Sequence, residues 1–326
     1  MNLLIGDLGG TNARFAMAEP DGTGFHSAHT FACVDFDTPD DAIRCYVEQM
    51  DVGAPDVICL AAAGAIIDNR VTFLNSHWVL DGKRLETRFS GARVHLMNDF
   101  EANAWCIPML GPADVELIGV AEGGIDGKEN FSVGVMGPGT GLGIAGLHCR
   151  SGHSLPVTGE GGHVGFAPET GLQIDILRHM RERFERVSQE RLLSGQGLEN
   201  IYESLLAIHH REEGRSPGAK GIFEAALNKS DVIAAESINV FFEILGQVAG
   251  NLVLSLGAWD GLYIAGGIVR RYPDELKSSS FRSGFESKGR YRAVMERIPT
   301  YLITHDEPGL LGAGHVARQL IARETA

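Results

Sequence analysis

The chain has 326 residues, 44% hydrophobic and 21% charged, an ordinary globular composition with length enough for two lobes. Its 42 acidic and 28 basic residues give a net charge of −14, which argues against a nucleic-acid partner because such proteins usually present a basic face. We see no signal peptide at the N-terminus, and the longest apolar run, residues 57–67, is too short to span a bilayer. Five cysteines without a CxxC pair are typical of reduced thiols, so we expect a cytoplasmic protein with no membrane partner.

The first third of the chain predicts strands that alternate with helices. A threonine, a proline and two acids at 38–41 predict a helix start, because a capping hydroxyl, a first-turn proline and negative charge all suit that end of a helix. Strands are predicted over 3–5 and 13–18, joined by a glycine turn, then over 26–31, 57–62 and 93–97, and the last leads into a helix over 100–106.

The same unit of strand, glycine turn and strand recurs about 125 residues later, which indicates a duplicated fold. Here the predicted strands cover 131–136 and 144–148, around a glycine-rich turn at 137–143. Further helices are predicted over 174–184, 198–209, 234–256 and 310–322, and a further strand over 262–265, which ends in Gly266 and Gly267. The alternation predicts α/β lobes.

Two glycine turns could bind phosphate, because backbone N–H groups converge on a phosphate only where side chains leave room. Gly9–Thr11 and Gly139–Gly141 both supply such a turn with a hydroxyl. Each also fits simple hairpin chemistry, and GPGTGLG matches neither the Walker A loop nor GxGxxG. Asp7, just before the first turn, either accepts a hydrogen bond from a turn amide or orients Mg²⁺ through water beside nucleotide phosphates.

Several polar residues have both a structural and a functional interpretation. Asn98-Asp99 follows a strand and opens a helix, where Asp99 is either part of an N-cap or an ionised general base. Glu160 and His163 flank two glycines that would cost a helix about 2 kcal/mol, so we expect a loop there and not a helical metal pair. Such a loop either holds a satisfied turn histidine or binds hydroxyl groups. Glu190 fits the first turn of a helix after Ser188, as a complement to the helix dipole.

Seven motifs together carry a resemblance that no single one carries. In chain order they are GDLGGTNAR, NDFEANA, GPGTGLG, GEGGHVGFAP, ERLLSG, IAGGIV and HDEPGLLGAG. The sequence resembles the bacterial ATP-dependent glucokinase family, within the superfamily of sugar kinases, actin and Hsp70, nearly end to end.

The resemblance implies an α/β, two-lobed actin-like ATPase (ribonuclease H-like) fold, with a duplicated βββαβα-type core and a deep interlobe cleft. The smaller lobe would comprise 1–109 plus 303–326, and the larger 110–302. The implied reaction transfers the γ-phosphoryl of MgATP to O6 of D-glucose, the first step of glycolysis. The implied assembly is a homodimer, and a broader hexose kinase is an alternative.

The family's functional residues carry over onto matching positions. The resemblance implies that Asp99 is the general base, and that the sugar is bound by Asn98, Asp99, Glu160, His163 and Glu190. It implies ATP and Mg²⁺ as cofactors, with Asp7 holding the metal through water. The nucleotide would contact Gly6, Asp7, Leu8, Gly9, Gly10, Thr11, Gly137, Gly139, Thr140, Gly141, Gly266 and Gly267. Gly165 departs from the family pattern, which has an aspartate there, and leaves fine sugar specificity open.

Two other classes of protein share parts of this pattern. A sugar-responsive regulator of the ROK family would carry a DNA-binding extension and usually a CxCGxxGCxE zinc motif, which this sequence lacks. An actin-like or chaperone-like ATPase would have no sugar site, and the set of Asn98, Asp99, Glu160, His163 and Glu190 speaks against it.

Overall fold

The computed structural model describes residues 1–73, 76–211 and 216–322. The chain forms two compact units. Unit 1 comprises Met1–Asp114, Leu155–Gly159 and His305–Ala326, and unit 2 comprises Val115–Ser154 and Glu160–Thr304. The lobes implied by the family resemblance have slightly different boundaries and place residues 155–159 in the larger lobe, whereas these residues cluster with unit 1 here.

Unit 1 is built on a five-stranded sheet of order β3-β2-β1-β4-β7. Its strands are β1 (Leu3–Leu8), β2 (Asn12–Ala18), β3 (Phe25–Ala32), β4 (Val57–Ala62) and β7 (Arg93–Asn98). β1 is antiparallel to β2 and parallel to β4, which is in turn parallel to β7. The predicted first hairpin is therefore confirmed, and β5 (Arg70–Thr72) and β6 (Val79–Asp81) form a separate two-stranded sheet.

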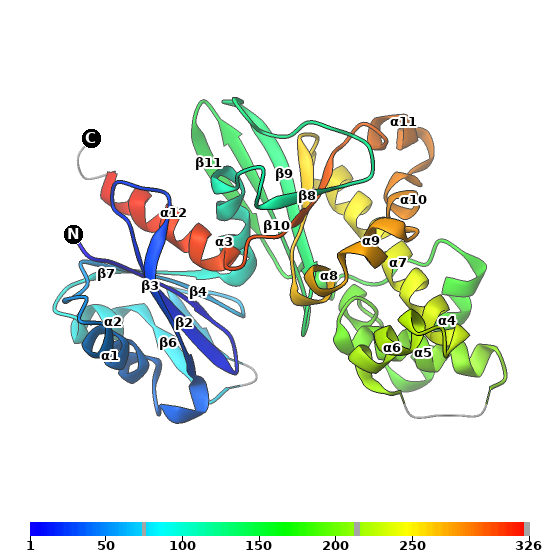
Figure 1. Ribbon diagram of the computed structural model, residues 1–326, viewed down its shortest axis with the longest axis horizontal. Helices are drawn as coiled ribbons and strands as arrows, with labels where there is room; N and C mark the ends of the chain where they lie inside the picture. Colours follow the sequence, from blue (N-terminus) through cyan, green and yellow to red (C-terminus); the bar gives the residue numbers. More distant parts are fainter. Residues whose placement is uncertain (74–75, 212–215, 323–326) are drawn as a thin grey trace. The chain divides into compact units, whose positions relative to one another are not determined.

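Helices cover both faces of the sheet in unit 1 (Figure 1). α1 (Pro39–Met50) and α2 (Gly82–Arg88) lie on one face, and α3 (Asp99–Cys106) and α12 (Pro308–Ala322) pack together on the other. Strand side chains alternate between faces, so Leu4, Leu8 and Phe15 join the core beneath α1. Short 3₁₀ turns, η1 (Cys33–Asp35) and η2 (Ile107–Met109), complete the unit.

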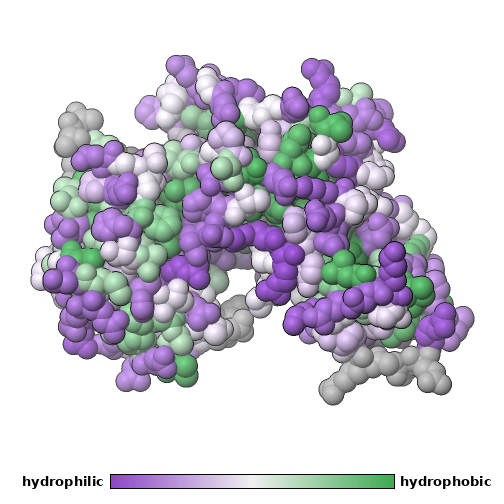
Figure 2. Space-filling view, viewed as in Figure 1, coloured by the Kyte–Doolittle hydropathy of each residue, from purple (hydrophilic) through white to green (hydrophobic). Residues whose placement is uncertain are grey.

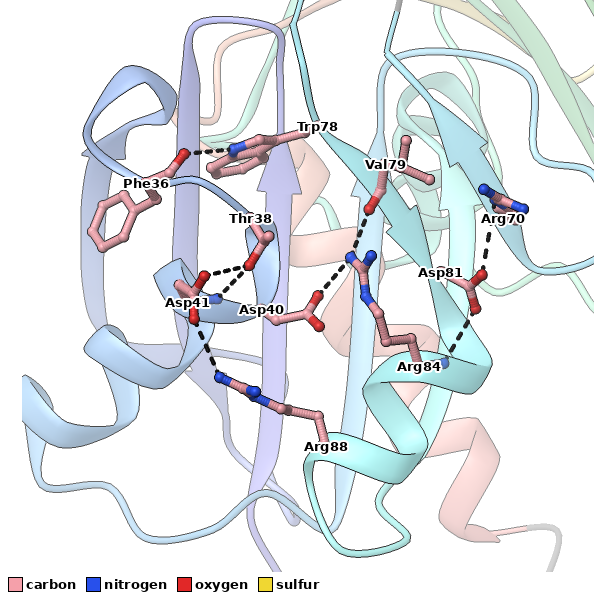
Figure 3. Close-up of polar contacts among 10 residues, drawn as sticks. All are labelled: Phe36, Thr38, Asp40, Asp41, Arg70, Trp78, Val79, Asp81, Arg84 and Arg88. Carbon is pink, nitrogen blue, oxygen red and sulfur yellow. Dashed lines mark hydrogen bonds and ion pairs between the residues drawn. The ribbon is translucent and has the colours of Figure 1, made fainter.

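Polar contacts connect α1, α2 and the small sheet (Figure 3). The Thr38 hydroxyl caps α1 by accepting from the Asp41 N–H at 3.2 Å, which confirms the predicted helix start. The Arg84 side chain joins its own helix, α2, to α1 and β6. Its Nη2 donates to Asp40 Oδ1 in α1 and to the Val79 carbonyl in β6, each at 2.8 Å. Asp40 is buried while Arg84 remains partly exposed.

The second main sheet has six strands in the order β11-β10-β9-β12-β13-β8, and its residues belong to unit 2 except for Leu155–Thr158 of β11. Its strands are β8 (Val115–Ile118), β9 (Phe131–Pro138), β10 (Leu142–Arg150), β11 (His153–Thr158), β12 (Gly261–Ile264) and β13 (Thr300–Ile303). β9 is antiparallel to β10 and parallel to β12, which is parallel to β13. The predicted repeat of strand, glycine turn and strand is confirmed, and in both units two parallel strands follow the hairpin.

Three helices of unit 2, α5, α6 and α10, pack against one long helix, α7 (Val232–Leu256), which also packs on β9 and β12 (Figure 1). The helices of unit 2 other than α7 are α4 (Gly171–Arg183), α5 (Gly195–Ile208), α6 (Gly218–Leu227), α8 (Gly267–Arg271), α9 (Pro273–Ser278), α10 (Phe281–Glu286) and α11 (Arg292–Met295), with 3₁₀ turns η3 (Gly161–His163), η4 (Gln189–Arg191) and η5 (Gly289–Tyr291). In the described residues, α7 alone has the length and apolar character of a membrane span. Most of α7 is buried in the core of unit 2, and the buried core helix of a globular protein can have the same length and apolar character as a membrane span.

The surface of each unit mixes hydrophilic residues with smaller hydrophobic groups on the face seen in Figure 2. The hydrophobic residues that fill the cores are in contrast almost fully buried, as in the unit 2 cluster that includes Phe241, Phe242 and Leu245. Each unit therefore has a hydrophobic core of its own.

Candidate active site

Three segments with polar or glycine residues end parallel strands of unit 1. The glycine hairpin follows β1, Gly64 follows β4, and Asn98 ends β7. Because β1, β4 and β7 are parallel neighbours, their carboxyl ends lie at one edge of the sheet, which is where open α/β sheets bind ligands.

The first glycine turn has only part of its backbone available for a ligand. Gly9 N–H donates to the Asn12 carbonyl at 2.9 Å and closes the hairpin. No backbone hydrogen bond in the described part of the chain uses the N–H of Gly10 or Thr11, so these two amides can bind an anion. Gly6 and Leu8 are buried strand residues of β1, so they shape the turn from beneath it.

Asp7 lies opposite Arg14 in the register of β1 and β2. Arg14 forms an ion pair with Glu307, and its Nε donates to Thr30 Oγ1 at 2.9 Å. Burial raises the pKa of Asp7 to about 6, an effect that the positive charge of Arg14 opposes and the negative charge of Glu307 reinforces. Gly309 in α12 is needed because a Cβ there would come within 2.8 Å of Asp7 Oδ2.

These surroundings fit a magnesium ion that travels with a nucleotide. The described residues contain no group of three or more His, Cys, Asp or Glu side chains that could cage a metal by themselves. Mg²⁺ usually keeps several waters and binds through one or two carboxylates plus substrate phosphates, and Asp7 beside the hairpin can supply one carboxylate.

Asn98, and not Asp99, caps α3. Asn98 Oδ1 accepts from the N–H of Phe100 at 2.8 Å and of Glu101 at 3.3 Å, and its Nδ2 donates to the Gly64 carbonyl at 3.1 Å. Asp99 is the first residue of the helix, and its Oδ1 accepts from the Phe100 N–H at 2.9 Å. The N-cap predicted at Asn98-Asp99 is therefore present and is supplied by Asn98, and one N–H of the Asn98 amide remains available for a ligand.

The second glycine turn, in unit 2, spans only Gly139–Gly141, because β10 already begins at Leu142 and Gly137 lies in β9. Gly139 N–H donates to the Gly141 carbonyl at 2.8 Å. Within the described residues, the N–H groups of Thr140 and Gly141 take part in no backbone hydrogen bond. This arrangement repeats that of the first turn, in which the first amide closes the turn and the next two can bind an anion.

A cavity of about 470 Å³ adjoins this turn in unit 2. It is lined by Gly139, Thr140, Gly195, Ala219, Lys220, Phe223, Gly267, Ile268, Arg271 and Tyr272. The cavity thus brings together two separate glycine motifs predicted from the sequence. Gly266 precedes it with a positive φ of 101°, a conformation that favours glycine.

The other walls of the cavity had no signal in the sequence. Lys220 and Arg271 supply two cations, and the lining contains no acid among the described residues. The rings of Phe223 and Tyr272 stack with centroids 3.7 Å apart and planes 7° apart. A cationic wall in a chain of net charge −14 favours an anionic ligand, and the aromatic pair adds a flat apolar surface.

The Glu160–His163 segment is a loop with one 3₁₀ turn, as expected, and both side chains are exposed. The loop sits tightly on β10, since a Cβ at Gly162 would come within 2.2 Å of the Leu142 carbonyl oxygen. Gln189 N–H donates to the Val164 carbonyl at 2.9 Å, so the loop is joined to the segment that carries Glu190. The fold thereby gathers three predicted sugar-binding residues of unit 2 around the start of β10.

Ser188 and Glu190 stand at the predicted N-cap and first-turn positions, but of a single 3₁₀ turn and not of a longer helix, and the Ser188 side chain makes no capping hydrogen bond. Glu190 Oε2 accepts from the Leu142 N–H at 2.9 Å.

Gly165 continues the loop and forms a β-bridge with Ser188. A Cβ at Gly165 would lie 3.9 Å from Arg186 Nη2, an ordinary contact distance. Arg186 Nη1 donates to the His163 carbonyl at 2.7 Å, so this loop is held without an acid at position 165.

Comparison with known proteins identifies the family. A family model described as Glucokinase matches residues 4–320. A curated glucokinase of Xanthomonas euvesicatoria pv. vesicatoria is 40% identical over 321 residues, which cover 97% of this chain and 94% of that protein. The solved structure of a glucokinase from an Antarctic psychrotroph aligns with a TM-score of 0.88 and 31% identity, over 98% of this chain and 99% of that one.

More distant structures share the fold. A ROK family glucokinase from Streptomyces griseus, solved in complex with glucose and AMPPNP, aligns with a TM-score of 0.64 and 22% identity over 98% of this chain and all of that one. The two units, each with a hairpin and two parallel strands, are those of the two-lobed actin-like sugar kinase fold. The chain belongs to the glucokinase family of ATP-dependent sugar kinases.

Proposed function

We propose that the chain transfers the γ-phosphoryl group of ATP to O6 of D-glucose and releases glucose 6-phosphate and ADP. The observation that carries this proposal is the cavity of unit 2, whose lining joins the turn at Gly139–Thr140 to the second motif at Gly267. A pocket with glycine turns, two cations and an aromatic pair suits a nucleotide with its phosphates. The Streptomyces griseus relative was solved with glucose and an ATP analogue, which supports both substrates.

The nucleotide would use both glycine turns. The N–H groups of Thr140 and Gly141 in unit 2, and of Gly10 and Thr11 in unit 1, would donate to phosphate oxygens. Arg271 and Lys220 would add charge, and Tyr272 a surface for the base. Bound Mg²⁺ would neutralise charge on the transferring phosphate, and Asp7 is the carboxylate that would hold it through water.

Asp99 would act as the general base of the transfer. As O6 attacks phosphorus, the bond from phosphorus to the ADP oxygen breaks and the O6 proton passes to the Asp99 carboxylate. The helix N-terminus favours the ionised carboxylate, and α3 has Asn98 for its cap. Asn98, Glu160, His163 and Glu190 would hold the sugar hydroxyls, because amide, carboxylate and imidazole groups can donate to or accept from them.

A hexose panel tests the proposal. Each sugar is incubated with MgATP, ADP release is followed by a coupled assay, and the product is identified by NMR. The proposal expects ADP release that depends on glucose and ceases when EDTA removes magnesium. ADP release at the same rate without any sugar would instead indicate a sugar-independent ATPase.

We also propose a cytoplasmic homodimer that serves glycolysis. All five cysteines are free thiols, as a reducing compartment would keep them. Light scattering at micromolar concentration tests the assembly, and a purely monomeric protein would remove that part of the proposal.

A further inference from the structure

Glu190, one of the expected sugar-binding residues, also contacts the second glycine turn, Gly139–Gly141, which we call the nucleotide turn. Its Oε2 accepts from the Leu142 N–H at 2.9 Å, and a Cβ at Gly141 would come within 2.4 Å of the same oxygen. The carboxylate therefore lies directly against the last residue of the turn that borders the cavity.

The segment that follows Glu190 binds the other end of the nucleotide turn, at Gly139. Gly195 N–H donates to the Gly139 carbonyl at 2.9 Å, and Gly195 lines the cavity beside Gly139 and Thr140. The Ser194 hydroxyl donates to the Glu190 carbonyl at 2.9 Å and keeps the short segment compact. The turn is thus held at Leu142 by a side chain and at Gly139 by a backbone bond.

Leu142 contacts both the nucleotide turn and the segment Glu160–His163, which we call the sugar loop. Its N–H binds Glu190, and its carbonyl oxygen packs against Gly162 of the loop that carries Glu160 and His163. A carboxylate has about four acceptor sites, so after one bond to Leu142 its second oxygen, Oε1, can still accept from a sugar hydroxyl.

We propose that Glu190 is a positioning residue that couples the sugar site to the nucleotide turn, an inference that rests on the proposed function. One carboxylate oxygen fixes the turn and the other binds a sugar hydroxyl. A bound sugar thereby holds the carboxylate and, through it, the amides of Thr140 and Gly141 in the arrangement that binds phosphate. Because coupling is reciprocal, sugar and nucleotide each tighten the binding of the other by the same factor.

The test compares Glu190→Ala, Glu190→Gln and the control Glu160→Ala. AMP-PNP binding is measured by calorimetry without sugar and with saturating glucose. Glu190→Ala should weaken AMP-PNP binding without sugar by roughly tenfold, since a bond to a charged acceptor is lost, and should abolish the effect of glucose on AMP-PNP affinity. Glu190→Gln retains an oxygen for the Leu142 N–H and should restore most of the sugar-free affinity. Glu160→Ala should weaken glucose binding and leave sugar-free AMP-PNP affinity unchanged.

A weakened glucose affinity with unchanged sugar-free AMP-PNP binding in Glu190→Ala would overturn the coupling and leave Glu190 as a sugar ligand only. That result would not touch the proposed function, which fails only if the wild-type protein does not phosphorylate glucose. Hydrogen exchange of the wild-type Leu142 amide gives a second readout that needs no variant. We expect it to be protected and to slow further with glucose, and exchange at the unprotected rate would contradict the proposal.

Discussion

Asp99 stands at the first position of α3, and the helix does not depend on it for a cap because Asn98 accepts from both Phe100 and Glu101. Asp99→Asn therefore keeps the shape of the site but cannot take a proton. We expect kcat to fall at least about a hundredfold, the usual cost of losing a general base, with glucose binding retained and the melting temperature within a few degrees of wild type. Steady-state kinetics and calorimetry measure both.

Glu101→Gln is the matched control for Asp99→Asn. Glu101 is an acid in the same helical turn, and burial raises its pKa, so a neutral side chain suits its site. Its kcat should stay within a few fold of wild type. A kcat for Asp99→Asn within about tenfold of wild type would place the base elsewhere.

Gly165 tests how much the sugar loop depends on its neighbours. The backbone at Gly165 has no positive φ, and Arg186 Nη2 lies 3.9 Å from where a Cβ would stand, so Gly165→Asp should fit and pair with Arg186. We expect an unchanged kcat and a KM for glucose within about threefold of wild type, because an exposed ion pair contributes at most about 1 kcal/mol. A large rise in KM, with Gly165→Ala as the neutral control, would mean that the pair displaces the His163 carbonyl from Arg186.

At the scale of elements, α1 and α2 are joined by the pair of Asp40 and Arg84 (Figure 3). The Asp40 side chain is 7% exposed, while Arg84 is 43% exposed and keeps its hydration. Asp40→Ala should therefore lower the free energy of unfolding by about 1–3 kcal/mol, less than the loss of a fully buried pair would cost. Arg44→Ala, which removes a 3.5 Å contact between exposed groups, should change it by less than about 0.5 kcal/mol in the same denaturation experiment. Equal effects of the two variants would contradict this account.

α12 carries a histidine whose burial should make stability depend on pH. Burial, assisted by the charge of Arg318, lowers the pKa of His315 to about 4. The centroid of the His315 ring lies 5.6 Å from that of the Trp105 ring on α3. Below about pH 6.5 this histidine binds a proton in the unfolded chain, whereas in the folded chain it does so only near pH 4. The contribution of His315 to the free energy of unfolding therefore falls as the pH falls from about 6.5 to about 4. Asp7 opposes the effect, because its pKa is raised to about 6 and its protonation favours the folded state over an overlapping range.

The two effects are separated by comparing His315→Gln with wild type, since only the histidine contribution changes. Between about pH 7 and pH 5 the unfolding free energy of the variant, relative to wild type, should rise by about 2 kcal/mol. Chemical denaturation at several pH values measures the difference. Parallel pH curves for the two proteins would show that His315 is protonated as easily in the folded chain as in the unfolded one.

The sequence predicted elements whose signals are local. The start of α1 at Thr38 and both glycine hairpins followed from residue types at fixed spacing. It could not predict which turn amides are already used, because Gly9 and Gly139 are committed by hairpin geometry. Nor could it predict the cations and aromatic pair of the cavity, since α6 and α8 meet there only in the folded chain. The contact of Glu190 with Leu142 was missed for the same reason.

At the scale of the whole molecule, each unit brings one half of the expected chemistry. Unit 1 carries the hairpin at Gly9–Thr11, Asp7 and the pair Asn98-Asp99, and unit 2 carries the cavity and the other residues expected to bind the sugar, Glu160, His163 and Glu190. The repeated order of hairpin and parallel strands gives each unit a glycine turn within its hairpin, between β1 and β2 in unit 1 and between β9 and β10 in unit 2. A kinase that acts on a sugar needs both halves, whereas an ATPase without a sugar site would not need Glu160, His163 and Glu190.

The most direct measurement is therefore the identity of the product that the wild-type protein makes from glucose and MgATP. Phosphorus and carbon NMR should show glucose 6-phosphate and ADP formed in equal amounts, with ADP release at background when glucose is left out. Phosphate on another hydroxyl, or ADP released equally fast without sugar, would contradict the assignment of this chain as a glucose 6-kinase.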